Sequence, residues 1–279
     1  MERYDQTFPL VYPKDLIMNK LLIDLEAIYQ KAFENVRYID VPKEIKKWRK
    51  ACDAQEVAVF CNLTRKHMNH IAEQLVALKK QFTKDNFVLN IYDGYSEMEK
   101  QSFTDLVLAS YLYKDFFSQS SPTENKYTLA VADSRYFNIM NDLQDKAGGN
   151  QFGLITVDDL PYEIPEAFKL VTQVNVNSAN ITMVEKIIIQ ESLRNIQFGA
   201  KKKQYYTIKN IAQQNLQNSK IPFSQTIFVI AAMIGKKVLT RVPMKMEAED
   251  GSTVNYLALN IGADKVVEDF LKKYNLEIK

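Results

Sequence analysis

The sequence has few residues of the types on which most catalytic and cross-linking chemistry depends. Its 279 residues include only two histidines, two cysteines and eight glycines. The histidines, His67 and His70, lie in one segment, so no separate histidine remains for a catalytic triad. The glycines are scattered and form no glycine-rich phosphate-binding loop. Cys52 and Cys61 flank one predicted helix with poor geometry for a disulfide, so we expect two free thiols in the reducing cytoplasm.

Long apolar runs are also missing. The longest run covers residues 227–234, and its eight residues are too few to cross a bilayer. The N-terminus lacks the basic-then-apolar pattern of a secretory signal. Hydrophobic residues make up 46% of the chain and charged residues 25%, which is typical of a soluble globular protein. We therefore expect no membrane partner.

Acidic residues are absent from one long segment. Residues 193–246 contain ten basic residues and no aspartate or glutamate, whereas residues 86–192 contain 15 acidic and 7 basic residues. A segment of one sign attracts polyanions, which makes nucleic acid the expected partner. The alternatives are docking of this segment onto the acidic stretch, or binding to an acidic protein or lipid head groups. The candidate phosphate-binding residues are Lys201, Lys202, Lys203, Lys209, Lys236, Lys237 and Arg241.

The order of predicted elements divides the chain into three regions. Residues 1–85 are predicted to be helical, with a first helix over residues 13–36. Residues 86–192 alternate strands with helices, which predicts an α/β domain with a largely parallel sheet, a mixed α+β fold being the alternative. Residues 193–279 are predicted to contain helices, a β-hairpin and a final helix. The strands of the α/β domain are expected at residues 87–92, 127–132, 152–157 and 170–176.

Residues 224–234 and the hairpin that follows them have the element order of a winged helix. In such a domain, the helix before the hairpin would enter the groove of a duplex. Here that helix reads SQTIFVIAAMI, which is too apolar for a polar reading face. The match to a winged helix is therefore loose.

Residues 54–74 have the pattern of two short helices joined by a tight turn. Val57 and Cys61 are apolar and four residues apart, and Asn62 tolerates the left-handed backbone that a turn requires. Met68 and Ile71 then recur at helical spacing. This pattern resembles the helix-turn-helix of DNA-binding proteins, with Asn62 in place of the usual turn glycine.

The resemblance implies a second helix that enters the major groove of DNA. An arginine on that helix pairs with guanine, an asparagine or glutamine pairs with adenine, and a lysine binds phosphate. The alternative is an ordinary amphipathic helix pair with a solvated outer face. The N-cap and outer-face residues that the resemblance assigns to DNA contact are Thr64, Arg65, Lys66, Asn69, His70 and Gln74.

Aspartates follow three of the predicted strands. Asp93, Asp133 and Asp158 would lie at the carboxyl edge of a parallel sheet, where carboxylates can hold Mg²⁺ for phosphodiester cleavage. The alternative is that each forms a turn or caps a helix. The same region is faintly similar to restriction-endonuclease-like nucleases, with Asp105 as the first acid. The position of their Glu-x-Lys motif reads Ala130-Val131-Ala132, which implies that the usual metal chemistry of that class is absent.

These observations favour a cytoplasmic DNA-binding protein that needs no cofactor. A regulator or an accessory factor of replication, recombination or a mobile element would fit them. One alternative is a Mg²⁺-dependent nuclease or phosphodiesterase that uses the strand-terminal aspartates. Another is a viral or phage structural or assembly protein, for which self-assembly into a homo-oligomer is expected.

Overall fold

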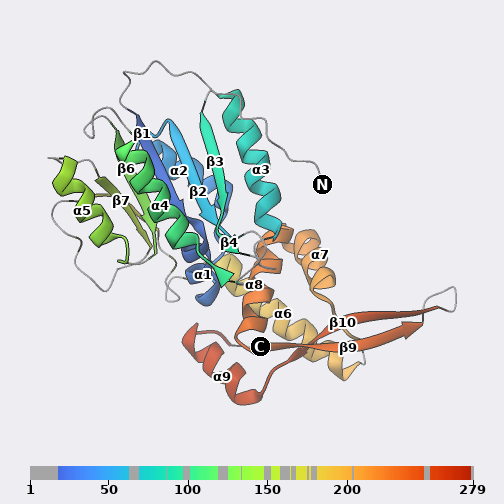
Figure 1. The fold of residues 1–279 in the computed structure, drawn as a ribbon. Coiled ribbons are helices and arrows are strands. Elements are labelled where there is room, and N and C mark those ends of the chain that lie inside the picture. The colour runs from blue at the N-terminus through green and yellow to red at the C-terminus, as the bar shows by residue number, and fades with distance from the viewer. Residues whose placement is uncertain are drawn as a thin grey trace.

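A six-stranded parallel sheet forms the centre of the computed structural model, in the order β3-β2-β1-β6-β7-β8 (Figure 1). The structure describes residues 18–62, 69–85, 87–96, 101–118, 125–132, 134–147, 152–157, 164, 168–174, 176, 181–202, 204–247 and 252–277. The strands are β1 (Asn19–Asp24), β2 (Glu56–Cys61), β3 (Val88–Asp93), β6 (Lys126–Val131), β7 (Phe152–Val157) and β8 (Lys169–Val174). The prediction of an α/β fold with a largely parallel sheet is confirmed.

The chain reverses its direction across the sheet between β1 and β6. It builds β1, β2 and β3 outward on one side and then returns to place β6 on the other side of β1. Ligands of open α/β sheets bind at the carboxyl ends of the strands where such a reversal occurs. We therefore expect a ligand site at the carboxyl ends of β1 and β6.

Helices cover both faces of the sheet. Leu21 and Ile23 of β1 point into one apolar core, and Leu22 between them points into the other. Because both faces are buried, the strands are almost continuously apolar. One core includes residues of α1 (Leu25–Glu34), α2 (Val41–Ala51) and α3 (Asn69–Lys84), and the other includes residues of α4 (Thr104–Phe117) and α5 (Phe137–Ala147). The short strands β4 (Tyr95–Ser96) and β5 (Gln101–Ser102) pair before α4.

The predicted first helix over residues 13–36 is wrong in its first half. Residues 19–24 form β1, and the helix begins only at Leu25. Asp24 ends the strand and caps the helix, because its Oδ1 accepts a hydrogen bond of 3.0 Å from the backbone amide of Ala27. An apolar run that is buried on both sides satisfies a strand as well as a helix, so the composition of this stretch did not distinguish them.

The predicted helix-turn-helix over residues 54–74 is also wrong in its first helix. Residues 56–61 form β2, which is hydrogen-bonded to β1 on one side and β3 on the other. Val57 and Cys61 are buried as predicted. The reason is that alternate residues of a strand share a face, and not that residues four apart share a face of a helix. The second predicted helix corresponds to α3, whose Ile71 is buried in the core as expected.

The predicted boundary at residues 85 and 86 falls inside one domain. β3 pairs with β2 along its whole length, from Val88 opposite Glu56 to Asp93 opposite Cys61. The expected helical region and the expected acidic α/β region therefore share a single sheet. The second predicted boundary, at residues 192 and 193, falls within α6 (Met183–Lys201).

The rest of the chain forms a C-terminal unit of helices and one long hairpin. It contains α6, α7 (Ile208–Ser219), α8 (Phe223–Gly235), the antiparallel strands β9 (Leu239–Glu247) and β10 (Thr253–Ile261), and α9 (Asp264–Lys273). In Figure 1 the hairpin extends away from the body of the molecule. The predicted succession of helices, hairpin and final helix is observed.

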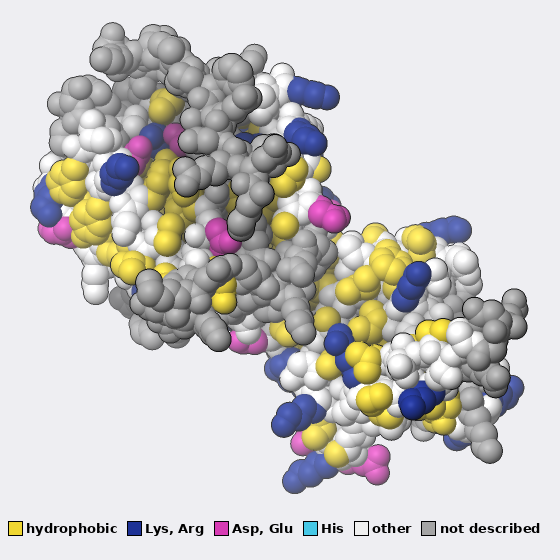
Figure 2. Space-filling model, turned by 45° about the vertical axis from the view of Figure 1, so that its right-hand side comes forward, with side chains coloured by type: hydrophobic (Ala, Val, Ile, Leu, Met, Phe, Trp, Pro, Cys, Tyr) yellow, Lys and Arg dark blue, Asp and Glu magenta, His cyan; other side chains and the backbone are white. Residues whose placement is uncertain are grey.

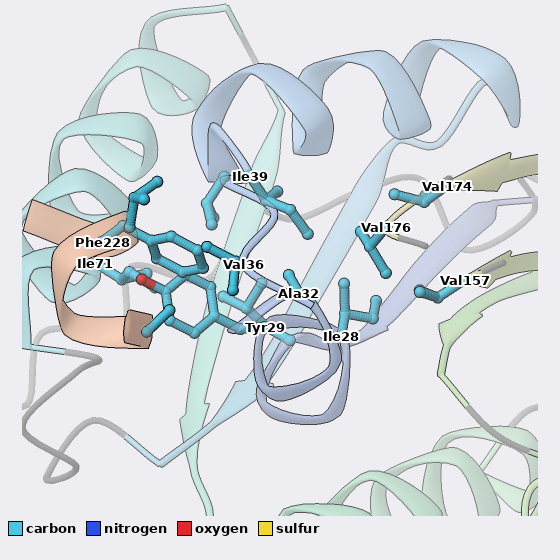
Figure 3. Close-up of a cluster of buried hydrophobic side chains, with 14 of the residues drawn as sticks. Ile28, Tyr29, Ala32, Val36, Ile39, Ile71, Val157, Val174, Val176 and Phe228 are labelled. Carbon is cyan, nitrogen blue, oxygen red and sulfur yellow. The ribbon is translucent and has the colours of Figure 1, made fainter. Parts of the chain in front are cut away.

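The helix before the hairpin, α8, is a core element that packs against α1. The ring of Phe228 meets the ring of Tyr29 edge to face, with centroids 5.1 Å apart (Figure 3). Phe33 and Tyr38 contact the same ring. Of all α8 residues, only Gly235 is exposed. This helix is therefore not available as the groove-reading helix of a winged helix.

A buried ion pair joins the C-terminal unit to the α/β domain. Glu185 of α6 is almost fully buried and accepts hydrogen bonds from Arg37 Nη1 and from the backbone amide of Tyr38, both at 2.6 Å. The same carboxylate accepts bonds from the amide and hydroxyl of Thr182, which caps α6. The four hydrogen bonds to the Glu185 carboxylate favour one relative orientation of the two parts.

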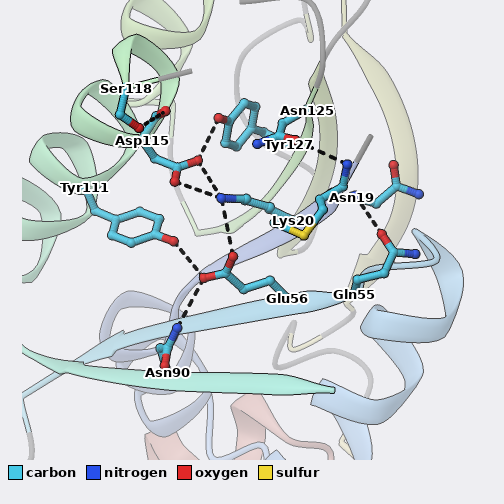
Figure 4. Close-up of polar contacts among 11 residues, drawn as sticks. Asn19, Lys20, Gln55, Glu56, Asn90, Tyr111, Asp115, Ser118, Asn125 and Tyr127 are labelled. Atoms are coloured by element: carbon cyan, nitrogen blue, oxygen red, sulfur yellow. Dashed lines mark hydrogen bonds and ion pairs between the residues drawn. The ribbon is translucent and has the colours of Figure 1, made fainter. Parts of the chain in front are cut away.

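A second buried polar network lies at the amino-terminal edge of the sheet. Lys20 of β1 is 6% exposed, and its Nζ lies 2.8 Å from both carboxylate oxygens of Asp115 and 3.3 Å from Glu56 (Figure 4). The hydroxyl of Tyr127 donates to Asp115, and that of Tyr111 donates to Glu56. This network connects β1, β2, β6 and α4 at the edge opposite to the carboxyl ends of the strands.

Candidate functional site

A pocket of about 240 Å³ lies at the carboxyl ends of the central strands, where the chain reverses direction across the sheet. Sites for drug-sized molecules usually enclose roughly 300–1,000 Å³, so this pocket suits a smaller group such as a phosphate or a hydrated cation. Its lining combines acidic, basic and amide side chains. The lining residues are Asp24, Glu26, Ala27, Gln30, Thr104, Asp105 and Arg135.

Asp24 is held in one orientation at the end of β1. It is 2% exposed, and while its Oδ1 caps α1, its Oδ2 accepts a hydrogen bond of 2.7 Å from the hydroxyl of Tyr136. Burial and the adjacent Asp24 carboxylate raise the pKa of Tyr136 well above its ordinary value. The tyrosine therefore stays protonated and continues to donate to the carboxylate at any physiological pH.

Glu26 provides a second carboxylate from the first turn of α1. It is 8% exposed, and its Oε2 accepts a hydrogen bond from the hydroxyl of Thr104, the first residue of α4. The positive end of the helix dipole favours a negative charge at this position. Gly94 allows α4 to start here, since a Cβ at this residue would lie 2.6 Å from Cα of Thr104.

A charged pair lies at the rim of the pocket. Arg135 Nη1 is 2.8 Å from Oδ2 of Asp105, and both side chains are exposed. An exposed pair of this kind contributes roughly 0–1 kcal/mol, so its partners exchange easily for a ligand. Arg135 can therefore offer its guanidinium to a phosphate that approaches the two buried carboxylates.

Cys61 ends β2 near the pocket but does not provide a nucleophile. Burial raises the pKa of its thiol to about 12, with further contributions from the carboxylates of Asp93, Glu26 and Asp24. A thiol with such a pKa is protonated at neutral pH and unreactive. Cys52 and Cys61 are both free, as the sequence predicted.

Of the three predicted metal ligands, only Asp93 is among the described residues, and it does not line this pocket. Asp93 lies at the exposed end of β3, which is three strand spacings, or roughly 14 Å, from β6. Asp133 and Asp158 lie outside the described residues. Within the described part of the chain, no three His, Cys, Asp or Glu side chains are close enough to hold a metal ion together.

Asp24 and Glu26 are not among the site residues predicted from the sequence. The signal was present, because the apolar run LLI ends in an aspartate in the same way as the other strands. Because residues 13–36 were predicted to form one helix, Asp24 did not stand at the end of a predicted strand. The position of Glu26 beside Thr104 depends on packing between α1 and α4, which no local pattern predicts.

The residues assigned to a DNA-reading helix are only partly described. Thr64, Arg65 and Lys66 lie outside the described residues, and Asn69 and His70 are the first residues of α3. Gln74 does not lie on a free outer face of α3. It is half-buried and lines a hollow of about 520 Å³ together with Asp40 of the α2 cap and Pro222 and Ser224 of the C-terminal unit.

The cations of the acid-free segment lie mostly on the surface. Lys236 is half-buried, and its burial, with a smaller effect of Lys273, lowers its pKa. Lys203 lies outside the described residues. Figure 2 shows Lys and Arg side chains spread over the C-terminal unit beside exposed hydrophobic ones. The exposed cations among the candidate residues are Lys201, Lys202, Lys209, Lys237 and Arg241.

No salt bridge between described residues joins these cations to the acidic stretch. None of the six candidate cations that the structure describes takes part in a described salt bridge, and the one described ion pair of the acid-free segment is Arg194–Glu191, within α6. The two parts of the molecule instead meet through the rings around Phe228 and the buried Arg37–Glu185 pair. Lys201, Lys202, Lys209, Lys237 and Arg241 are therefore exposed and accessible to a partner.

The helices described here include none that is both long and apolar enough to cross a membrane. The geometry thus provides two features on separate parts of the chain: a small pocket with two buried carboxylates, and a positively charged surface. Comparison of the chain with protein-family models, curated proteins and solved structures finds no match to any of them.

Proposed function

We propose that the protein binds nucleic acid through its C-terminal unit. The observation that carries this proposal is the exposure of Lys201, Lys202, Lys209 and Arg241 on a segment without acidic residues, with no salt bridge to the α/β domain among the described residues. Each cation that neutralises a phosphate releases a condensed counterion, which is the main source of sequence-independent affinity. DNA is the favoured ligand, and RNA offers the same phosphate chemistry.

The mode of binding we propose is sequence-independent. Reading of base edges requires a polar element that enters a groove, and α8 is apolar and packed against α1. The hairpin of β9 and β10 carries exposed Arg241 and Lys245, which suit contact with the phosphate backbone. An accessory factor of replication, recombination or a mobile element fits this mode better than a regulator that recognises one site.

Replacement of Lys201, Lys202 and Lys209 by glutamine tests the proposal. The triple variant should bind every sequence more weakly, and the slope of log affinity against log salt should fall by roughly 0.7–0.9 for each phosphate that is no longer neutralised. Fluorescence anisotropy with a labelled oligonucleotide at several salt concentrations measures both quantities. The matched control replaces Lys79, Lys80 and Lys84, which are exposed on α3. Equal weakening in both triple variants would contradict a role for the C-terminal unit.

A second candidate function is metal-assisted phosphodiester hydrolysis at the pocket. Asp24 and Glu26 are two buried carboxylates at the carboxyl edge of the sheet, with Arg135 at the rim. Mg²⁺ is commonly held by one or two carboxylates together with water and substrate phosphates, so these residues fit such an ion. A bound Mg²⁺ would activate water and polarise the phosphate. The protein's own part is to fix the two carboxylates through Tyr136 and Thr104 and to bind the phosphate with Arg135.

Incubation with end-labelled DNA and RNA separates this candidate from binding alone. We expect strand cleavage in the presence of Mg²⁺ or Mn²⁺ and none in the presence of EDTA, whereas binding should persist in both conditions. Gel electrophoresis of the products measures the outcome. Strands that stay intact with Mg²⁺, with Mn²⁺ and with EDTA would contradict hydrolysis and leave only the proposal of nucleic-acid binding.

A further inference from the structure

Two exposed aromatic side chains flank the turn between α6 and α7. Phe198 of α6 is 53% exposed, and Tyr205 in the connection to α7 is 47% exposed. Single exposed hydrophobic residues are common on protein surfaces and need no explanation. These two lie on either side of one short turn, and Tyr205 is also followed by a third aromatic, Tyr206.

The turn that brings them together is closely packed. The backbone amides of Lys202 and Gln204 both donate to the carbonyl of Gly199, at 2.9 and 2.8 Å. A Cβ at Gly199 would lie 2.5 Å from the carbonyl oxygen of Gln204 and 2.7 Å from the ring of Tyr206, so only glycine fits. The Gly199–Gln204 hydrogen bond holds the backbone positions next to Phe198 and Tyr205 together.

Tyr206 anchors the connection to the body of the C-terminal unit. Its side chain packs against the main core, and its carbonyl oxygen accepts a hydrogen bond of 2.7 Å from the amide of Leu259 in β10. Tyr205 precedes this anchored residue and remains exposed. An exposed ring on an anchored backbone loses little conformational freedom when it binds a ligand.

Three exposed lysines are close neighbours of the two rings in the chain. Lys201 at the end of α6 and Lys202, which follows it, are both exposed, and Nζ of Lys202 lies 4.4 Å from the ring centroid of Phe198. Lys209 is exposed at the start of α7. Because residues 193–246 contain no acid, no carboxylate of this segment offsets these charges. Aromatic rings among lysines are the combination that proteins use to bind single strands, with bases stacked on the rings and phosphates near the cations.

We infer that the surface formed by Phe198, Lys201, Lys202, Tyr205 and Lys209 binds single-stranded nucleic acid, with bases stacked on the two rings. This inference rests on the proposed binding of nucleic acid and adds the class of strand. In a duplex the faces of the bases are covered by their neighbours, so the rings can stack only on unpaired bases. The protein therefore prefers a single strand to a duplex of equal length.

The test is fluorescence anisotropy of the full chain with labelled 20-nucleotide dT and U strands and a 20-base-pair duplex of mixed sequence. Wild type should bind the single strands more tightly than the duplex. The double variant Phe198→Ala with Tyr205→Ala should bind both single strands at least about tenfold more weakly, while its duplex affinity and its salt slope stay unchanged. Phe198→Trp should retain the affinity for the single strands, because indole also stacks on bases.

Phe117→Ala is the matched control, since Phe117 is 57% exposed and lies 5.7 Å from Nζ of a lysine, Lys146, on the α/β domain. It should change neither affinity. Equal affinity of wild type for single strands and duplex, or equal weakening of both in the double variant, would overturn this inference and leave the proposed function intact. Binding to none of the three probes would overturn both. Equal affinity for the dT and U strands would show that the site accepts both DNA and RNA. Tighter binding of one strand would show which of the two is the preferred ligand.

Discussion

Lys20→Met should lower the free energy of unfolding by roughly 3–5 kcal/mol, the cost of removing one partner from a buried ion pair. The Nζ of Lys20 lies between Asp115 and Glu56, and all three side chains are largely buried. Methionine fills the same volume but leaves two carboxylates next to each other without a cation. Equilibrium denaturation in urea, followed by circular dichroism, measures the change.

The matched control for Lys20 is Lys146→Met. Lys146 pairs with Asp142 at 2.9 Å, but both side chains are about half exposed, so its loss should cost less than about 1 kcal/mol. Adding Glu56→Gln and Asp115→Asn to Lys20→Met should recover part of the stability, since no unpaired charge then remains. A Lys20→Met variant as stable as wild type would show that water reaches this network.

Asp24→Asn should reduce the proposed metal-dependent cleavage by more than the roughly 10- to 100-fold that loss of an outer hydrogen-bond partner of a metal site costs. Asparagine still caps α1, because its amide oxygen can accept the bond from Ala27, so the fold should persist. It removes a negative charge that would hold a cation. Initial rates on an end-labelled strand, together with the melting temperature, measure the two effects separately.

Two other variants serve as controls for the effect of Asp24→Asn on the cleavage rate. Tyr136→Phe removes the hydrogen bond to Asp24 but leaves its charge, so its effect on the rate should be smaller. Asp105→Asn changes an exposed carboxylate at the rim and should have the smallest effect. Affinity for nucleic acid should stay unchanged in all three variants, because none of them alters the exposed lysines and arginine of the C-terminal unit. Full activity of Asp24→Asn would exclude the pocket as the site of hydrolysis.

Local pattern was a good guide for some strands and a poor one for others. β6 and β7 were predicted at residues 127–132 and 152–157, within a residue of their actual bounds, because polar loops and aspartates delimit each run. β1 and β2 were assigned to helices. Buried parallel strands lack the alternation that identifies a strand, and the four-residue spacing of Val57 and Cys61 suits a helix as well as a strand.

The amino-acid sequence by itself determined the α/β class, the excess of cations in residues 193–246 and the two free thiols, because these follow from composition and short-range periodicity. Only the tertiary structure decided which strand lies beside which. β1 pairs with β6, more than 100 residues away, and this pairing sets Asp24 at the point where the chain reverses direction across the sheet. It also decided that α8 is covered by α1 and that Phe198 and Tyr205 face solvent. Such choices depend on contacts between segments far apart in the chain, whose energies no local window contains.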